Sequence, residues 1–377
     1  MRFDSTPYYH VGEDYSWQGL VKEMREEVRL MDQGGFTGLW LAEHHFAWDG
    51  WYRAPTDPIL VGADLIAESD RMRVGQCGAI IPDWNPIRVA EDIAILDQLT
   101  KGRVDFGAGR GINTRSTIQF FKEADRRDPE RNRALFREVL DIVVAALEND
   151  AFSYKGRFYT YPTPGWYETN PLVRDPKYHA DDGELIALGV TPRPYQKPRP
   201  PVYVMAETTG SFGYAGQKGY NAMCASLSIG RIKEAFAAHN RGASERLGSP
   251  VPTGEGVAVM RPTFVAETYE EAVQAVRPGA NRLAAWSSVN PHKARLTTLI
   301  EEELEEGDLD LDWFDFQLKH NLILVGSVDS VSEQIERIRS ETGCRHIALF
   351  LNFPGLSFQQ VMSSLSLFSE RIIPRFA

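Results

Sequence analysis

The feature that most constrains the fold of this chain is a regular alternation between short apolar runs and longer segments with helical periodicity. The runs are rich in β-forming residues, and helical segments separate every pair of them. This alternation predicts parallel βα units rather than a β-sandwich. Eight runs occur, at residues 2–7, 37–42, 73–80, 104–108, 202–206, 221–225, 257–265 and 346–351.

The clearest helical segment spans residues 86–99. It begins with a proline, which is favoured in the first helical turn, and its apolar residues recur at helical spacing before Gly102. Similar periodicity predicts helices at residues 133–147, 229–247 and 331–340.

Eight strands alternating with helices in 377 residues fit a closed (β/α)8 TIM barrel, although an open doubly wound sheet gives a similar linear pattern. The strand count favours the barrel. No GxGxxG motif follows the first strand, so the usual sequence support for a dinucleotide-binding open sheet is missing. We therefore expect an α/β fold in which a single TIM barrel occupies residues 1–377.

Two connections are longer than simple barrel loops, and we expect both as insertions at the C-terminal face of the barrel. The first, residues 152–200, holds eight prolines and several aromatic residues, which favours an ordered, irregular insertion over a helix. The second, residues 278–320, contains acids that alternate with apolar residues such as Leu311 and Trp313. It is either a lid or a solvated acidic helix followed by a surface loop.

The net charge limits which classes of binding partner are expected. The chain has 52 acidic and 41 basic residues, a formal net charge of −11, so a general attraction to nucleic acid or to an anionic membrane is not expected. The first residues lack the apolar core of a secretion signal, and no apolar stretch is long enough to span a bilayer. Three widely separated cysteines suggest neither a disulfide framework nor a zinc knuckle. We expect a cytoplasmic protein that acts on small molecules.

Glu43, His44, His45 and Phe46 follow the second predicted strand directly, on the rim where barrel enzymes carry their active sites. Adjacent strand residues point to opposite faces, so the two histidines cannot easily bind one metal ion together. No other histidine pair offers further ligands, although His10 is a loose candidate. We therefore expect no metal site, and the alternative for the two histidines is a purely structural role.

Two further strand ends lie on the same predicted rim. After the third strand, the small residues Cys77 and Gly78 would allow a flat ring to approach closely, or the glycine would accommodate barrel curvature. After the fourth strand, Arg110 stands between glycines. An arginine there can hold a phosphate bidentately or pair with an acid.

The fifth strand leads into Glu207, Thr208, Thr209 and Ser211, followed by a short helical segment. Hydroxyls and free amides at a helix N-terminus bind phosphate, and plain helix capping is the alternative. With Arg110 on the neighbouring strand, the two features would converge on one side of the barrel mouth.

A set of motifs, taken in order along the chain, is more specific than any single one. The first is LWLAEHHF at residues 39–46. The others lie at residues 74–75, 81–82, 86–92, 96–103, 106–107, 110–111 and 201–207. This ordered set resembles the bacterial luciferase-like flavin-dependent monooxygenase family, with good coverage to about residue 225 and thinner coverage beyond it.

The resemblance implies a single barrel that binds reduced FMN at its C-terminal mouth and uses O2, through a peroxyflavin, to oxygenate a small organic substrate. It implies that His44 is the catalytic acid/base residue. Cys77 and Gly78 fall where the family has an unusual cis peptide beneath the isoalloxazine ring, and Arg110 falls at the family's phosphate cradle. The rest of that cradle would be Glu207, Thr208, Thr209 and Ser211.

The resemblance also implies a two-component system, in which a separate NAD(P)H-dependent flavin reductase supplies the reduced FMN, and a homodimer formed through barrel helices. No dinucleotide fingerprint accompanies the barrel, which agrees with a separate reductase. Three alternatives stay open: an F420-dependent oxidoreductase of the same fold, a non-catalytic flavin-binding protein, and a metal-dependent barrel hydrolase.

The chain departs from luciferase itself at two positions. Gly109 stands where luciferase has a cysteine, and Asn113 stands where it has an aromatic residue, which counts against light emission from a long-chain aldehyde. Aromatic residues near the first two strands would line an apolar substrate cavity or pack in the core. They are Tyr8, Tyr9, Trp48 and Trp51.

Overall fold

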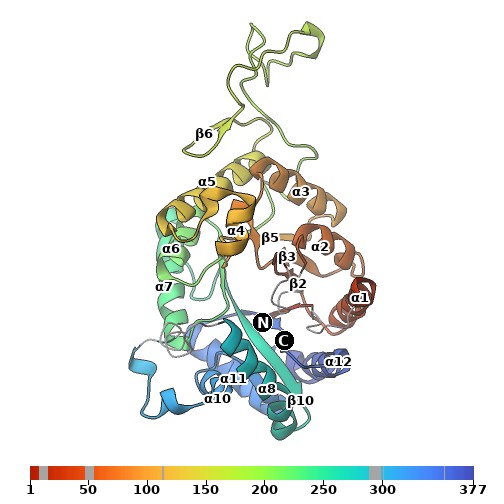
Figure 1. Ribbon diagram of the computed structural model, residues 1–377, viewed down its shortest axis with the longest axis vertical. Coiled ribbons are helices and arrows are strands. Elements are labelled where there is room, and N and C mark those ends of the chain that lie inside the picture. Colours follow the sequence, from red (N-terminus) through yellow and green to blue (C-terminus); the bar gives the residue numbers. More distant parts are fainter. Residues whose placement is uncertain (8–15, 47–54, 113, 288–298, 300, 352) are drawn as a thin grey trace.

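The computed structural model describes residues 1–7, 16–46, 55–112, 114–287, 299, 301–351 and 353–377 (Figure 1). Parallel strands form a closed barrel in the order β1, β2, β3, β5, β8, β9, β10 and β12, and β12 pairs back with β1. The predicted (β/α)8 barrel is therefore confirmed, and each of the eight predicted runs supplies one barrel position. The strands are β1 (Arg2–Thr6), β2 (Gly38–Leu41), β3 (Arg73–Gln76) with β4 (Ala79–Ile80), β5 (Val104–Gly109), β8 (Val202–Met205), β9 (Asn221–Cys224), β10 (Val257–Ala266) and β12 (His346–Phe350).

One further strand was not predicted from the sequence. Strand β11 (Leu324–Ser327) pairs in parallel with residues 263–266, the second half of β10, beyond the part of β10 that joins the barrel ring. It leads directly into a helix that begins at Val328. The strand has only four residues and runs without a break into the helix, so it does not stand out from the helices around it.

Helices surround the barrel (Figure 1) and bury their apolar faces against its outer wall. The predicted helix at residues 86–99 is confirmed at both ends: Asn85 caps it by accepting hydrogen bonds from the amides of Ile87 and Arg88, and Thr100 follows its last residue. The helices are α1 (Trp17–Gln33), α2 (Pro58–Ile66), α3 (Pro86–Leu99), α4 (Thr114–Phe120), α5 (Pro129–Glu148), α6 (Thr209–Lys218), α7 (Ile229–Leu247), α8 (Tyr269–Ser287), α10 (Trp313–Lys319), α11 (Val328–Thr342) and α12 (Phe358–Leu367).

The segment between α5 and β8 extends away from the barrel as an irregular arm (Figure 1). It contains the short antiparallel pair β6 (Tyr154–Lys155) and β7 (Thr160–Tyr161) and the 3-10 turn η3 (Pro171–Val173), with no α-helix. Its base is fastened by the buried carboxylate of Glu138, which accepts three hydrogen bonds of 2.8 Å from the amides of residues 157–159.

The second long connection runs from α8 to β11, and residues 288–298 and 300 of it lie outside the described part. The rest forms the 3-10 turns η4 (Glu301–Glu303) and η5 (Asp308–Asp310) and then α10. Apolar residues of this segment, among them Leu299, Phe316 and Leu322, form a small core of their own. The alternation of acids with apolar residues therefore builds a packed unit here rather than a single acidic helix.

The N-terminal end of the barrel is closed by a buried network of charged side chains. Asp105 accepts hydrogen bonds from Arg2 (2.8 Å) and Arg73 (2.7 Å), and Asp4 accepts one from Nε2 of His346 (2.6 Å). Burial alone would raise the pKa of Asp4, but His346 and Arg2 hold that pKa well below its usual range. Because this end is filled, a ligand can approach the barrel axis only from the C-terminal end.

Candidate functional site

Glycines leave the barrel wall without side chains at several positions of β3 and β5. A Cβ atom on Gly75 would lie 2.4 Å from the indole of Trp40, and one on Gly107 would lie 1.6 Å from the carbonyl oxygen of Gln76. Both positions therefore require glycine, and Trp40 fills the space above Gly75. Nearer the C-terminal end, a Cβ on Gly109 would meet nothing closer than 3.8 Å. The wall at Gly109 is therefore buried backbone without a side chain, with room for a Cβ atom beside it.

The peptide bond between Cys77 and Gly78 is cis, as the sequence resemblance predicted. It connects β3 to β4 and lies against Met205 of β8 and Gly109 of β5, whose atoms would be 2.8 Å and 3.1 Å from a Cβ on Gly78. Burial raises the pKa of the Cys77 thiol to about 12, so this thiol stays neutral at physiological pH. Together with Gly109, the cis peptide presents a flat, neutral surface of backbone at the mouth.

His44 lies immediately beyond β2, at the same end of the barrel. It is partly buried, and its amide donates a hydrogen bond to the carbonyl oxygen of Pro55 (3.4 Å). The preceding residue, Glu43, is 2% exposed and accepts hydrogen bonds from Nε2 of His45 (2.7 Å) and from the amide of Ile80 (2.8 Å). The two residues beside His44 are thus paired with each other, while His44 is held at the rim by its backbone.

A second acid, Asp83, lies beside the Glu43 carboxylate in the 3-10 turn η1 (Ile81–Asp83). Both of its carboxylate oxygens are shielded from solvent and have no hydrogen-bond partner in the described part of the chain. Burial, and then the charge of Glu43, raise the pKa of Asp83 to about 7, against the lowering effect of His45. Sequence reasoning missed this residue, because a lone aspartate in a turn gives no signal of its own.

Arg110, at the end of β5, lies among other arginines rather than among acids. Its Nη1 donates to Oδ1 of Asn132 (3.3 Å), and no carboxylate in the described residues forms an ion pair with it. Burial lowers the pKa of Arg110, and the positive charges of Arg126, Arg133 and Arg137 lower it further. Four guanidinium groups gathered in this way favour the binding of an anion. The three additional arginines were not predicted.

The N-terminus of α6 adjoins this arginine cluster. Thr208 caps the helix through its hydroxyl, which accepts from the amide of Ser211 (3.3 Å), while the amides of Thr209 and Gly210 make no hydrogen bond within the described residues. A link to the cluster is Arg137, whose guanidinium carbon lies 4.6 Å from the ring centre of Tyr214 in α6. Arg110 follows β5 and α6 follows β8, and these two strands are neighbours in the barrel, so the cluster and the free amides follow adjacent strand ends.

Glu207 makes its side-chain hydrogen bonds within the protein. Its carboxylate accepts hydrogen bonds from the amides of Ala225 (2.7 Å) and Ser226 (3.4 Å), and so joins the end of β8 to the end of β9. The surrounding protein atoms raise the pKa of this carboxyl, against the lowering effect of the two amides. The carboxylate is thus occupied within the protein, and only its backbone is free to face an anion.

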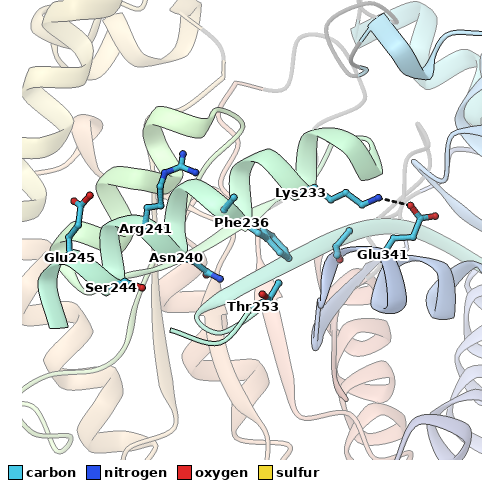
Figure 2. Close-up of a pocket in the computed structure, with 10 residues that line it drawn as sticks. Lys233, Phe236, Asn240, Arg241, Ser244, Glu245, Thr253 and Glu341 are labelled. Carbon is cyan, nitrogen blue, oxygen red and sulfur yellow. Dashed lines mark hydrogen bonds and ion pairs between the residues drawn. The ribbon is translucent and has the colours of Figure 1, made fainter. Parts of the chain in front are cut away.

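A surface pocket of about 550 Å³ lies elsewhere, along α7 (Figure 2). Its lining comes from α7, from Thr253 before β10 and from the end of α11, where Lys233 pairs with Glu341 at 2.8 Å. Thr253 and the end of α11 precede the N-terminal ends of β10 and β12, whereas His44 follows the C-terminal end of β2. This pocket is not part of the mouth.

No group of three or more potential metal ligands occurs among the described residues. In the same residues, no helix is long and apolar enough to cross a membrane. Other residues of interest lie outside the described part of the chain: Tyr8, Tyr9, His10, Trp48, Trp51 and Asn113.

Comparison with known proteins identifies relatives of the whole chain. The model of the luciferase-like monooxygenase family matches residues 1–346. The oxygenase component of a flavin-dependent trigonelline monooxygenase from Acinetobacter baylyi is 24% identical over 373 residues, which is 97% of this chain and 93% of the relative.

Solved structures of the same fold cover the full length. Monooxygenase RslO1 from Streptomyces bottropensis has a TM-score of 0.77 at 23% identity, with 100% of both chains covered. The oxygenating constituent of 3,6-diketocamphane monooxygenase from Pseudomonas putida, in complex with FMN, has a TM-score of 0.74 at 18% identity, covering 100% and 99%. An F420-dependent secondary alcohol dehydrogenase has a TM-score of 0.68 at 17% identity, also covering 100% and 99%. The shared fold therefore accommodates either cofactor.

Proposed function

This chain belongs to the luciferase-like monooxygenase family, and from that premise we propose that it is the oxygenase of a two-component system, using reduced FMN and O2 to oxygenate a small organic substrate. The observation that carries the proposal is the bare backbone surface of Cys77, Gly78 and Gly109 beside the arginine cluster around Arg110. A flat ring and a phosphate group, joined in one molecule, match these two features.

FMN fits the residues that are present. Arg110, with no acid paired to it among the described residues, would hold the phosphate, and the free amides of Thr209 and Gly210 would donate to it. The hydroxyls of Thr208 and Ser211 would complete the contact, while Glu207 would contribute only its backbone. The ring would lie on the cis peptide and Gly109. When bound, reduced FMN supplies the electrons that activate oxygen.

His44 is the residue that we assign to proton transfer. It stands at the rim beside the proposed ring site, and an imidazole gains and loses a proton near neutral pH. Glu43 and His45 are paired with each other, and His44 between them is partly buried at the rim. The N-terminal end of the barrel is closed, and the buried Trp40 lies across the barrel interior. Both would prevent water from reaching the reacting atoms from the N-terminal side.

The preference for FMN over F420 rests on two relatives. The trigonelline monooxygenase is described as flavin-dependent, and the 3,6-diketocamphane enzyme was solved with FMN. The first is also described as an oxygenase component, which supports a separate NAD(P)H-dependent reductase as the source of reduced flavin. A non-catalytic flavin-binding protein would bind the same cofactor without consuming oxygen faster than free flavin does.

Anaerobic titration with reduced FMN, followed by oxygen, tests the proposal. We expect saturable binding of reduced FMN, and oxygen uptake that yields an oxygenated product from at least one member of a panel of ketones, aldehydes and N-heterocycles. Binding without any product from the panel, and with all oxygen recovered as hydrogen peroxide, would leave only a flavin-binding protein. Binding of reduced F420 in place of reduced FMN would replace the cofactor assignment.

We also propose that the enzyme is a homodimer. Leu60 of α2 and Ile95 and Leu99 of α3 are large apolar residues exposed on adjacent helices of one side of the barrel, and packing between two such sides would cover them. Sedimentation velocity is expected to give twice the monomer mass. Replacing Leu60 and Leu99 with aspartate is expected to give monomers, and a wild-type monomer at micromolar concentration would refute the dimer.

A further inference from the structure

We infer that Glu43 is a positioning residue for His44, and that it acts with His45 and Asp83 as one buried acid cluster that couples the end of β2 to the cis-peptide segment. The inference rests on the proposed function, in which His44 handles the proton at the mouth. It assigns a task to two residues of the EHHF run and to Asp83, none of which needs to touch cofactor or substrate.

The geometry of Glu43 ties three segments together. Its Oε1 accepts hydrogen bonds from Nε2 of His45 (2.7 Å) and from Nε1 of Trp84 (2.9 Å), and its Oε2 accepts from the amide of Ile80 (2.8 Å). Ile80 ends β4, which begins one residue after Gly78, and Trp84 follows η1. A carboxylate that accepts three hydrogen bonds while 2% exposed fixes the backbone on which it stands.

This fixation bears directly on His44, the next residue in the chain. Continuing the side-chain alternation of β2 past Leu41 places Glu43 and His44 on opposite sides, so the anchoring of Glu43 to Ile80 and Trp84 directs His44 away from them. The same carboxylate also holds the strand end that follows the cis peptide. Glu43 thereby sets the spacing between the proposed proton-transfer residue and the proposed ring surface.

The protonation state of Asp83 decides how many carboxylate charges the cluster holds. Glu43 and His45 are the titratable groups that act on it, and its own oxygens have no hydrogen-bond partner in the described chain. While Asp83 is protonated, the cluster holds a single carboxylate charge, that of Glu43, beside His45. Once Asp83 loses its proton, two carboxylates face each other in a poorly solvated space, and their repulsion loosens the anchor of Glu43.

The aromatic surroundings hold this cluster behind the rim. The His45 ring lies 4.5 Å from the ring of Phe120 in α4, and Phe120 stacks in turn on Phe46 at 5.6 Å. His45 is therefore held between a carboxylate and an aromatic face. These contacts make the cluster a support on which the mouth is built rather than part of the reacting surface.

Glu43→Gln is the direct test, because the amide keeps the shape but removes the charge and turns one acceptor into a donor. Glu138→Gln is the matched control: Glu138 is also buried and also accepts three hydrogen bonds, but it fastens the arm. The readouts are the histidine NMR signals of the flavin-free protein, the dissociation constant of reduced FMN, and the yield of oxygenated product per flavin oxidised.

In Glu43→Gln we expect the His44 and His45 signals to shift, the product yield to fall at least tenfold and the reduced-FMN affinity to change less than threefold. Glu138→Gln should keep the His44 signal and the product yield. A folded Glu43→Gln protein with unchanged His44 signals and yield would overturn the inference. If wild type itself fails to bind reduced FMN, the proposed function fails instead, while the NMR comparison still decides whether Glu43 positions His44.

Asp83→Asn provides a second test should Glu43→Gln fail to fold. We expect the wild-type product yield to decline as Asp83 loses its proton near pH 7. An asparagine holds the cluster permanently in the singly charged state, so in Asp83→Asn that decline should move to higher pH or disappear. An identical pH profile in Asp83→Asn and wild type would show that Asp83 does not govern the cluster.

Discussion

Nη1 of Arg110 lies 3.3 Å from Oδ1 of Asn132, so the guanidinium at the end of β5 meets a neutral amide and has no acid paired with it among the described residues. Arg126, Arg133 and Arg137 add positive charge around it. A folded chain keeps such a cluster at a cost in repulsion, because like charges destabilise one another at short range. An anionic ligand removes that cost, which is why the cluster points to a phosphate.

Replacing Arg110 with alanine is expected to weaken the binding of reduced FMN by about 10- to 100-fold, since a hydrogen bond to a charged group contributes about 1.5–3 kcal/mol. Arg241→Ala is the control, because Arg241 is an exposed arginine of α7, away from the mouth. Anaerobic fluorescence titration measures both. Equal dissociation constants in Arg110→Ala and wild type would contradict the phosphate assignment.

Replacing His44 with alanine is expected to abolish substrate oxidation while leaving fold and flavin affinity largely intact. The imidazole is assigned to proton transfer, a contribution of about 10²- to 10⁴-fold in rate. Product yield and reduced-FMN affinity should be measured on the same preparation. A variant that remains fully active would remove His44 from its role.

Two glycines of β5 make a paired prediction. Gly107→Ala should fail to fold or be strongly destabilised, because its Cβ would lie 1.6 Å from a backbone oxygen. Gly109→Val should fold, because the nearest atoms to its Cβ are 3.8 Å away, but its methyl groups would occupy the proposed ring surface. We expect at least tenfold weaker flavin binding at a melting temperature close to wild type. Unchanged flavin affinity in Gly109→Val would place the ring elsewhere.

Much of this architecture could be predicted from the sequence, because buried parallel strands and amphipathic helices have periodic signatures. All eight barrel strands and the helix from Pro86 to Leu99 follow from that periodicity. Strand β11 was not predicted, since its four residues lead straight into a helix. The arginines beside Arg110 were also missed, because Arg126 and the α5 residues Arg133 and Arg137 reach it only through tertiary packing, and each has the sequence signature of an ordinary surface residue.

The cluster behind His44 shows the same limit. Glu43 and His45 attracted attention by their position after β2, but their mutual hydrogen bond depends on how the chain turns after the strand. Asp83 is forty residues from Glu43 in the sequence, and the pairing of β2 with β3 brings η1 against the end of β2. Spacing along a chain does not encode such a contact.

Asp83 also predicts a pH dependence of stability. Its pKa is raised from the ordinary value of 3.8 to about 7, so the folded state favours the protonated form. Its contribution to stability is complete below about pH 4 and is lost as the pH rises toward 7. Asp83→Asn should therefore be more stable than wild type by about 1–3 kcal/mol at pH 8, and no more stable near pH 4.

Thermal unfolding of Asp83→Asn and wild type at pH 4, 6 and 8 checks that prediction. Asp315→Asn, on the exposed end of the α10 segment, is expected to show no gain at pH 8, because Arg277 pairs with Asp315 at 2.6 Å. A constant difference between Asp83→Asn and wild type at all three pH values would mean that Asp83 does not titrate in this range.

The central claim, an oxygenase that works with reduced FMN, is tested most directly by parallel anaerobic titrations with reduced FMN and reduced F420, each followed by oxygen and a panel of small organic substrates. The account predicts that reduced FMN binds at micromolar concentration, that Arg110→Ala weakens this binding, and that oxygen then yields an oxygenated product. Tight binding of reduced F420 alone, with hydride transfer and no oxygen consumption, would contradict it.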